Sequence, residues 1–325
     1  MKVLSLIYQD KKNAGPKAKR DIDKILEKEY GAKIIKLYRV GNFRIKTLLT
    51  FVRYMFSKDI LVLQMPMILK SAAYRVLPKN RTILLVHDID GLRHMNEEVL
   101  NKEINIFKQF KYVIVHNEKM KDFLIEKGVD KDCLYVLGLF DYLVENQTDE
   151  VKEDENDFFF VGNLDKEKST FIYQFKEGEL SRSTNLYGLN VKEDELDKKL
   201  IYKGSFEPEN LSGLEGKVGI IWDGSKEDDN YNDPYKNYTR YNNPHKLSCY
   251  MACGKPVVVW EEAACANFVE KNDVGYKIKK LEDINKIDFS DYETKKKNAE
   301  EIQKKVISGE YTREVFKTII SKIET

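Results

Sequence analysis

The sequence has few of the residues that mark several classes of protein. Only four of its 325 residues are cysteines and none of them forms a CxxC pair, so neither a disulfide scaffold nor a cysteine zinc site is expected. The four histidines also lack the spacing of zinc ligands. Lys and Arg number 55 against 54 Asp and Glu, a formal net charge of +1, without the basic excess typical of nucleic-acid-binding proteins. The cysteines are expected to be small buried thiols in a reducing compartment.

Long apolar runs and common cofactor motifs are also missing. The only apolar run near the start, residues 3–8, is too short and wrongly flanked for a signal peptide, and no stretch reaches membrane-spanning length. The sequence contains no GxGxxG fingerprint, P-loop or nucleophile elbow, so an NAD site of the usual kind is unsupported. We therefore expect a cytoplasmic protein, with peripheral association at the inner face of the membrane left open.

The first half of the chain alternates short β-rich runs with helical patterns. Such an order predicts parallel strands joined by crossover helices. The expected strands are residues 3–8, 33–37, 60–64, 82–87, 112–116 and 134–139. The expected helices are residues 18–30, 45–56, 67–77, 97–107 and 118–127, the last one capped by Asn117 and stopped by Gly128.

A second series of the same kind follows an acidic segment, residues 145–157, that holds a single apolar residue. Its strands are expected at 158–161, 184–187, 200–202, 218–222, 257–260 and 276–278, before two helices within 291–322 that break at Ser308-Gly309. We place a domain boundary in the acidic segment, giving an N-terminal domain of residues 1–148 and a C-terminal domain of residues 149–325. The predicted fold is α/β, with two Rossmann-like doubly wound domains that bind ligands in a cleft at the carboxyl ends of both sheets.

The segment from Asn243 to Trp260 is the most informative part of the chain. It reads as a capped helix followed by a buried strand, because Asn243 fits the N-cap, Pro244 the first helical position and Gly254 the position after the helix. Lys246 then falls in the first turn, where its ammonium, unpaired backbone N–H groups and the positive end of the helix dipole converge. This arrangement suits a phosphate or a diphosphate. An ordinary capped helix with a solvated Lys246 is the alternative that the pattern leaves open.

Three segments of the chain resemble a family of bacterial sugar transferases. They are residues 243–260, residues 219–224 (Gly-Ile-Ile-Trp-Asp-Gly) and residues 86–93 (Val-His-Asp-Ile-Asp-Gly-Leu-Arg), and the resemblance extends over most of the chain. The family includes glucosyltransferase 3 of serine-rich adhesin glycosylation and galactofuranosyltransferase-like proteins. The resemblance implies the two-domain GT-B fold with C-terminal helices crossing back, a uridine diphosphate sugar as donor, and a homo-oligomer formed through the C-terminal region.

The resemblance also bears on the phosphate-binding helix. Residues 243–246, Asn-Pro-His-Lys, match the version that this family uses. Large retaining GT-B families instead carry two glutamates eight residues apart, where this chain has Tyr241 and Cys249. Their retaining mechanism is therefore not carried over, and the stereochemical outcome stays open.

Loops that follow strands of the second domain are expected to hold the nucleotide sugar. Asn163 follows one strand, and Asp223-Gly224 follows another, where a carboxylate can reach sugar hydroxyls. Arg182 could fork onto the diphosphate opposite Lys246, and Phe206 could lie on a uracil face. A plain turn, a solvated arginine and a core phenylalanine are the simpler interpretations of Asn163, Arg182 and Phe206. The predicted nucleotide-sugar-binding residues are Gly15, Asn163, Arg182, Phe206, Asp223, Gly224, Asn243 and Lys246, with Gly15 in the loop after the first strand.

The segment after the fourth expected strand brings two aspartates to the carboxyl edge of the first sheet. Asp88 and Asp90 are candidates for the base that takes the acceptor hydroxyl proton, and Arg93 could orient one of them. In the structural alternative, Asp88 caps a turn and pairs with Arg93. Asp88-Ile89-Asp90 also matches the D-x-D pattern with which a single-domain glycosyltransferase fold binds a divalent metal. The two Rossmann-like halves and the positive charge of Lys246 argue against that fold, so we expect neither a metal nor another cofactor.

Together with the resemblance, these patterns predict a metal-independent hexosyltransferase. It would move a hexosyl unit from a UDP-sugar, UDP-glucose or a form of UDP-galactose, to a hydroxyl of a glycan on a protein or lipid carrier, with Asp90, Asp88 and Lys246 as catalytic residues. Two alternatives stay open, a noncatalytic nucleotide-sugar-binding partner of another transferase and a metal-dependent D-x-D enzyme. A basic, aromatic helix at 43–58 could dock a membrane or a protein acceptor, although packing on the first sheet explains it more simply.

Overall fold

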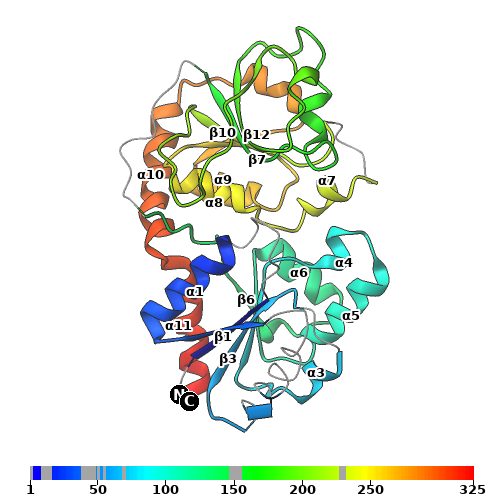
Figure 1. Ribbon diagram of the computed structural model, residues 1–325, viewed down its shortest axis with the longest axis vertical. Coiled ribbons are helices and arrows are strands. Elements are labelled where there is room, and N and C mark those ends of the chain that lie inside the picture. Colours follow the sequence, from blue (N-terminus) through cyan, green and yellow to red (C-terminus); the bar gives the residue numbers. More distant parts are fainter. Residues whose placement is uncertain are drawn as a thin grey trace. The chain divides into compact units, whose positions relative to one another are not determined.

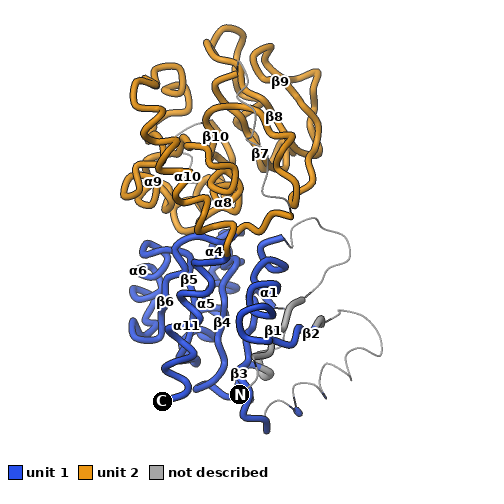
Figure 2. The backbone as a smooth tube through the Cα atoms, turned by 90° about the vertical axis from the view of Figure 1, so that its left-hand side faces the viewer, with its two compact units in different colours: residues 1–141, 309–325 blue, residues 142–308 orange. Residues whose placement is uncertain are grey.

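The chain folds into two compact units, each built around one parallel sheet (Figure 1). The computed structural model describes residues 3–8, 17–37, 49, 52–53, 56–67, 71–145, 156–226 and 232–325. Unit 1 comprises residues 1–141 and 309–325, and unit 2 comprises residues 142–308 (Figure 2). Each sheet has six strands and helices on both faces, so the predicted pair of doubly wound α/β domains is confirmed.

In unit 1 all neighbouring strands are parallel, in the order β2-β1-β3-β4-β5-β6. The strands are β1 (Val3–Tyr8), β2 (Lys33–Leu37), β3 (Ile60–Met65), β4 (Thr82–Val86), β5 (Tyr112–Val115) and β6 (Leu134–Val136). The helices are α1 (Lys17–Tyr30), α3 (Ser71–Val76), α4 (Asp90–Arg93), α5 (Glu97–Phe107), α6 (Glu118–Glu126) and α11 (Glu310–Glu324), with a 3₁₀ turn η1 (Lys131–Cys133).

Alternate residues of the unit 1 strands face two different layers of helices. Val62 belongs to a buried cluster with Leu26 of α1 and Phe316 of α11. Leu63, the next residue of β3, belongs to a cluster on the other face with Phe107 of α5. All six residues of β3 are buried, as expected when helices cover both faces of a parallel sheet.

Helix α11 completes unit 1 after the chain has built all of unit 2. It lies beside α1 (Figure 1) and is separated from the last helix of unit 2 by Gly309, whose φ is 80°. Buried Asp141 accepts hydrogen bonds from the backbone N–H groups of Tyr311 (3.3 Å) and Thr312 (2.7 Å) in the first turn of α11. Burial raises the pKa of Asp141 to about 7. The expected division after residue 148 differs from these units, because Asp141 and the apolar face of α11 hold that helix in unit 1.

In unit 2 the parallel strands have the order β12-β11-β10-β7-β8-β9. They are β7 (Phe158–Asn163), β8 (Thr184–Leu189), β9 (Leu200–Tyr202), β10 (Val218–Ile221), β11 (Val257–Trp260) and β12 (Gly275–Ile278). The helices are α7 (Pro234–Tyr238), α8 (His245–Ala252), α9 (Ala266–Asn272) and α10 (Tyr292–Ser308), with 3₁₀ turns η2 (Thr170–Tyr173), η3 (Glu193–Glu195) and η4 (Leu281–Lys286).

Each sheet has one place where the order of strands reverses. In unit 1 the chain runs outward from β1 to β2 and then returns to β3 on the other side of β1; in unit 2 it runs from β7 to β9 and then returns to β10. We call the carboxyl end of β1 and β3 the first switch point, and that of β7 and β10 the second switch point. Sheets of this type bind ligands outside the carboxyl ends of the strands at these positions.

Several local predictions can be compared with the structure. The Asn117 side chain accepts a hydrogen bond from the Met120 N–H (2.9 Å) and caps α6, as expected. The predicted break at Ser308-Gly309 separates α10 from α11. The predicted helix at 45–56 lies for the most part outside the described residues. Within the part of the chain that is described, no helix has both the length and the apolar character needed to span a membrane.

Candidate functional sites of the two units

Helix α8 begins at the carboxyl edge of the unit 2 sheet. It connects β10 to the parallel strand β11, so its amino end lies where β10 ends. The prediction that Asn243 is the N-cap is wrong: Pro244 is extended (φ −67°, ψ 140°) and occupies that position itself. Because proline has no side-chain acceptor, the cap makes no side-chain hydrogen bond to the first turn.

Lys246, in the first turn of α8, is held at the second switch point. Its Nζ donates to the Trp222 carbonyl oxygen (2.8 Å) and to Asp223 Oδ1 (2.8 Å), two residues that directly follow β10. It also lies 4.4 Å from the ring centroid of Phe160 in β7. The side chains of Lys246 and Asp223 are only 9% and 12% exposed. Burial lowers the pKa of Lys246, and the Asp223 carboxylate opposes that shift. The solvated alternative for Lys246 therefore does not apply.

Two glycines, Gly162 and Gly224, lie close to this ion pair, and only the second is required by its surroundings. A Cβ added to Gly162 of β7 would stand 4.0 Å from Lys246 Nζ. Gly224 has φ 76°, and a Cβ there would collide with the carboxylate of Asp233. Asp233 accepts hydrogen bonds from the Ser225 N–H (2.6 Å) and from two N–H groups at the start of α7. The loop after β10 is thus fixed on both sides of Asp223.

Not all of the predicted binding residues meet at this point. Asn163 ends β7, and its Oδ1 accepts a hydrogen bond from Asn190 Nδ2 (2.8 Å). Arg182 precedes β8, so it lies at the amino edge of the sheet, 3.6 Å from Asp157 Oδ2 and 2.8 Å from the Ile287 carbonyl oxygen. It is not brought together with Lys246, because a residue before a parallel strand lies at the edge opposite the residues that follow it.

Phe206 and Gly15 are also not placed beside Lys246 by the structure. Phe206 is half-buried and follows β9, the edge strand, which β8 separates from β7. Gly15 lies outside the described residues.

The rings of the chain's two tryptophans contact the ammonium group of a lysine, which the sequence patterns did not predict. The Nζ of buried Lys236, in α7, lies 3.2 Å from the ring centroid of Trp222 and 4.0 Å from that of Trp260. This cation–π contact ties α7 to the ends of β10 and β11. The available signal was the position of both tryptophans at the ends of expected strands.

At the carboxyl edge of unit 1, Asp88 is engaged by Arg93 of α4. Its Oδ2 accepts a hydrogen bond from Arg93 Nη1 (3.0 Å), and the Arg93 and Asp88 side chains are 35% and 29% exposed. The pairing that was the structural alternative for Asp88 is therefore present. Asp90 instead opens α4, and burial, with a smaller contribution from the Asp88 carboxylate, raises the pKa of Asp90.

Two further charged residues accompany these aspartates. Glu103 of α5 accepts hydrogen bonds from the backbone N–H groups of Asp90 (2.9 Å) and Gly91 (2.8 Å), and burial raises the pKa of Glu103 to about 7. Half-buried Lys19 of α1 is attracted by Asp88 and Asp90, while burial lowers the pKa of Lys19. Neither residue could be assigned from the sequence, because Glu103 and Lys19 belong to other helices than the segment they act on, and no local pattern connects them with it.

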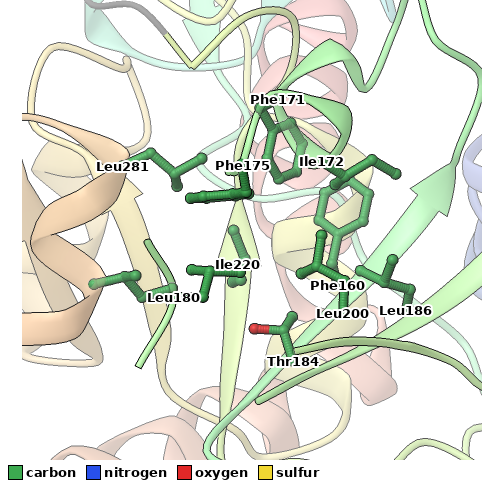
Figure 3. Close-up of a pocket in the computed structure, with 11 residues that line it drawn as sticks. Phe160, Phe171, Ile172, Phe175, Leu180, Thr184, Leu186, Leu200, Ile220 and Leu281 are labelled. Atoms are coloured by element: carbon green, nitrogen blue, oxygen red, sulfur yellow. The ribbon is translucent and has the colours of Figure 1, made fainter. Parts of the chain in front are cut away.

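The cavity drawn in Figure 3 is too small for a nucleotide. Its free volume is ≈ 10 Å³, about the space of a single water molecule. Its lining is apolar except for Thr184, with residues such as Phe171, Leu186 and Leu281 around it. It is a packing gap between the sheet of unit 2 and its 3₁₀ turns. Among the side chains that are described, no three His, Cys, Asp or Glu residues gather as a metal site.

Two solved structures share this architecture over the whole chain. HepE of Anabaena in complex with UDP has a TM-score of 0.62 and 15% sequence identity, with 100% of both chains covered. The apo form of the lipopolysaccharide outer core galactosyltransferase WaaB has a TM-score of 0.58 and 11% identity, covering 99% of this chain and 100% of that one. At these identities the likeness shows the fold, which is GT-B.

Sequence comparison identifies the family. The β-1,6-galactofuranosyltransferase WbbI of Escherichia coli K12 is 32% identical over 292 residues, which cover 85% of this chain and 83% of that protein. Glucosyltransferase 3 of Streptococcus parasanguinis is 22% identical over 73% of this chain and 69% of its own length. The family models for the N-terminal and C-terminal domains of glucosyltransferase 3-like proteins match residues 1–139 and 158–319. The chain therefore belongs to the glucosyltransferase 3-like family of glycosyltransferases.

Proposed function

We propose that the protein transfers a hexosyl unit from a UDP-sugar, UDP-glucose or a form of UDP-galactose, to a hydroxyl of a glycan carried by a protein or lipid. The observation that carries this proposal is the position of Lys246, buried at the second switch point beside the amino end of α8. The names of the relatives, a galactofuranosyltransferase and a glucosyltransferase, and the solved complex of HepE with UDP-glucose support the choice of donor.

On the donor side, Lys246 and the helix stabilise the departing diphosphate. The ammonium has three N–H donors, and its contacts with Trp222 and Asp223 account for two of them. The third donor and the first-turn N–H groups of α8 supply positive charge where the leaving group gains negative charge. Asp223 keeps the ammonium in place, and no metal is needed for charge neutralisation in this scheme.

On the acceptor side, we assign the base to Asp90 and give Asp88 a supporting role. Asp88 is already engaged by Arg93, whereas Asp90 has a raised pKa and therefore holds a proton more firmly than an ordinary aspartate. A base whose pKa lies closer to the working pH accepts the hydroxyl proton more effectively in the transition state. In this proposal Asp90 removes that proton as the acceptor oxygen attacks the sugar.

The test compares the two cations that the sequence assigned to the diphosphate. Lys246→Ala should abolish the rise in melting temperature that UDP gives the wild-type protein and should remove transfer. Arg182→Ala is the matched control: it changes a cation at the opposite edge of the same sheet and should leave the UDP-dependent rise unchanged. A wild-type response to UDP in Lys246→Ala would remove that residue from the donor site.

The same assay separates the alternatives. UDP binding by the wild-type protein without transfer to any acceptor would indicate a nucleotide-sugar-binding partner of another transferase. Transfer that stops on addition of a chelator, and returns with a divalent cation, would indicate the metal-dependent D-x-D mechanism through Asp88 and Asp90.

A further inference from the structure

Tyr250 of α8 places its hydroxyl between two strands at the second switch point. Its side chain is fully buried. The hydroxyl accepts a hydrogen bond from the Val161 N–H of β7 (3.0 Å) and donates one to the Ile220 carbonyl oxygen of β10 (2.9 Å). A tyrosine hydroxyl has one proton to donate and lone pairs that accept, so both hydrogen bonds can form at the same time. The two strands are therefore joined at this point through a side chain of a helix.

The register of the sheet shows which hydrogen bond the hydroxyl replaces. The strands β10 and β7 are parallel, and the Val218 N–H donates to the Asp157 carbonyl oxygen (2.9 Å). In a parallel ladder each such residue also accepts a bond from the other strand, and the bonds recur every two residues. The same register would therefore join the Val161 N–H directly to the Ile220 carbonyl oxygen. The Tyr250 hydroxyl occupies that rung of the ladder, and the pairing of the two strands ends directly before it.

The Tyr250 ring packs closely against both strands. A Cβ added to Gly219 of β10 would stand 2.4 Å from a ring carbon, which is closer than any side chain tolerates, so glycine is required there. Phe159 of β7 contacts the ring edge to face, with 4.9 Å between the ring centroids and 79° between the planes. Aromatic pairs favour this geometry. The ring thus holds its hydroxyl at the rung from both sides.

Lys246 lies one helical turn before Tyr250, on the same face of α8. Whereas Tyr250 donates to the carbonyl oxygen of Ile220, Lys246 Nζ donates to that of Trp222, two residues further along the chain (2.8 Å). On the other strand, Lys246 Nζ lies 4.4 Å from the ring centroid of Phe160. These contacts of Lys246 lie directly beside the rung that Tyr250 fills. A shift of either strand at that rung would therefore move the partners of the ammonium.

We propose that Tyr250 is the positioning residue of Lys246. By filling one rung of the ladder, its hydroxyl holds β7 and β10 apart and keeps the ammonium between their carboxyl ends. Without the hydroxyl, a buried N–H and a buried carbonyl would lose their partners, and the strands would shift toward each other to pair them. The consequence for the donor rests on the proposed function, because that shift would move Lys246 out of line with the diphosphate.

A matched pair of tyrosine variants tests this assignment. Tyr250→Phe removes the hydroxyl and keeps the ring. Tyr74→Phe, in α3 of unit 1, removes another buried hydroxyl, which donates to the Met67 carbonyl oxygen (2.9 Å). Both variants should have a lower melting temperature, but only Tyr250→Phe should bind UDP more weakly, by about tenfold in titration calorimetry, the equivalent of one lost contact. Wild-type affinity for UDP in Tyr250→Phe would show a purely structural role and overturn the proposal.

The position of the end of β10 can be measured without any ligand. The chain's two tryptophans, Trp222 and Trp260, lie at the ends of β10 and β11, so tryptophan fluorescence reports on this edge of unit 2. Tyr250→Phe should shift the emission maximum, and Tyr74→Phe should leave it unchanged. An unshifted spectrum in Tyr250→Phe would contradict the proposal. If the spectrum shifts but the wild-type protein does not bind UDP, the proposed function fails and the positioning of Lys246 by Tyr250 stands.

Discussion

The two switch points occupy the same topological position in two similar sheets, yet they carry opposite chemistry. The second switch point presents the ammonium of Lys246, balanced by Asp223 and lying over the ring of Phe160. Next to the first switch point, at the carboxyl end of the neighbouring strand β4, lie Asp88 and Asp90 beside a histidine whose ring is hydrogen-bonded to the buried amide of Gln64 in β3. In the proposed function, one fold element repeated in the chain would serve an anionic leaving group in unit 2 and a hydroxyl that must lose its proton in unit 1.

The difference in charge also shows in how strongly each edge holds protons. Burial lowers the pKa of Lys246 at the second switch point, which favours release of a proton. In unit 1, burial and neighbouring carboxylates raise the pKa of Asp90 and that of Glu103, which favours uptake. Because desolvation always disfavours the charged form, the same burial shifts cations and anions in opposite directions.

The largest effect is expected on turnover when Asp90 or Asp88 of unit 1 is substituted. Asp90→Asn should lower turnover by a factor of about 10² to 10⁴, because the amide cannot take the acceptor proton, while the UDP-dependent rise in melting temperature stays unchanged. Asp88→Asn should lose less, since Asp88 is already paired with Arg93. Steady-state kinetics with saturating donor measure both. An Asp88→Asn variant more impaired than Asp90→Asn would reverse the assignment of the base.

The next largest effect is expected on stability, when the carboxylate that balances Lys246 at the second switch point is removed. Asp223→Ala leaves the buried ammonium of Lys246 without its carboxylate and should lower the free energy of unfolding by about 3 kcal/mol. UDP should then raise the melting temperature more than it does in the wild type, because the diphosphate replaces the lost negative charge. Asp194→Asn, on the exposed turn η3, is the control and should change neither quantity. An Asp223→Ala protein as stable as wild type would mean that the ion pair contributes little.

The smallest effect concerns the pH dependence of stability. Glu103 has a folded-state pKa of about 7 against an ordinary value of 4.5, so the folded state binds more protons between these values. The free energy of unfolding should therefore fall as the pH rises through that window. Glu103→Gln should reduce the fall, but not remove it, because Asp141 contributes in the same direction. Urea unfolding at the two ends of the window measures the change, with exposed Glu97→Gln as control; equal slopes in Glu103→Gln and wild type would contradict the assignment.

The fold could be predicted from the sequence because fully buried parallel strands leave continuous apolar runs. The predicted ranges of β1, β2, β9 and β11 coincide with the observed strands, and the other predicted strands differ from the observed ones by only a few residues at their ends. Lys246 could be singled out for a related reason, since a proline, a lysine and a following glycine define a helix and its first turn locally.

The remainder of the site depends on contacts that no local pattern records. Gln64 and Asp23 are 41 residues apart in the sequence, and Lys246 and Asp223 are 23 apart. In the sequence, Gln64 is a single polar residue in an otherwise apolar strand, and its partner on α1 cannot be identified. Arg182 was assigned wrongly for a different reason. Its charge suggested that it binds the diphosphate, but its position before β8 places it at the other edge of the sheet.

The return of α11 to unit 1 has a consequence for biosynthesis. Phe316 and Ile319 of α11 fill the same buried cluster as the strands of the first sheet, and the carboxylate of Asp141 is satisfied by the first turn of α11. On the ribosome, the strands of unit 1 therefore emerge long before the helix that covers one of their faces. Unit 2 can complete its fold during translation, whereas unit 1 must keep an apolar surface open until the chain beyond Gly309 has been made.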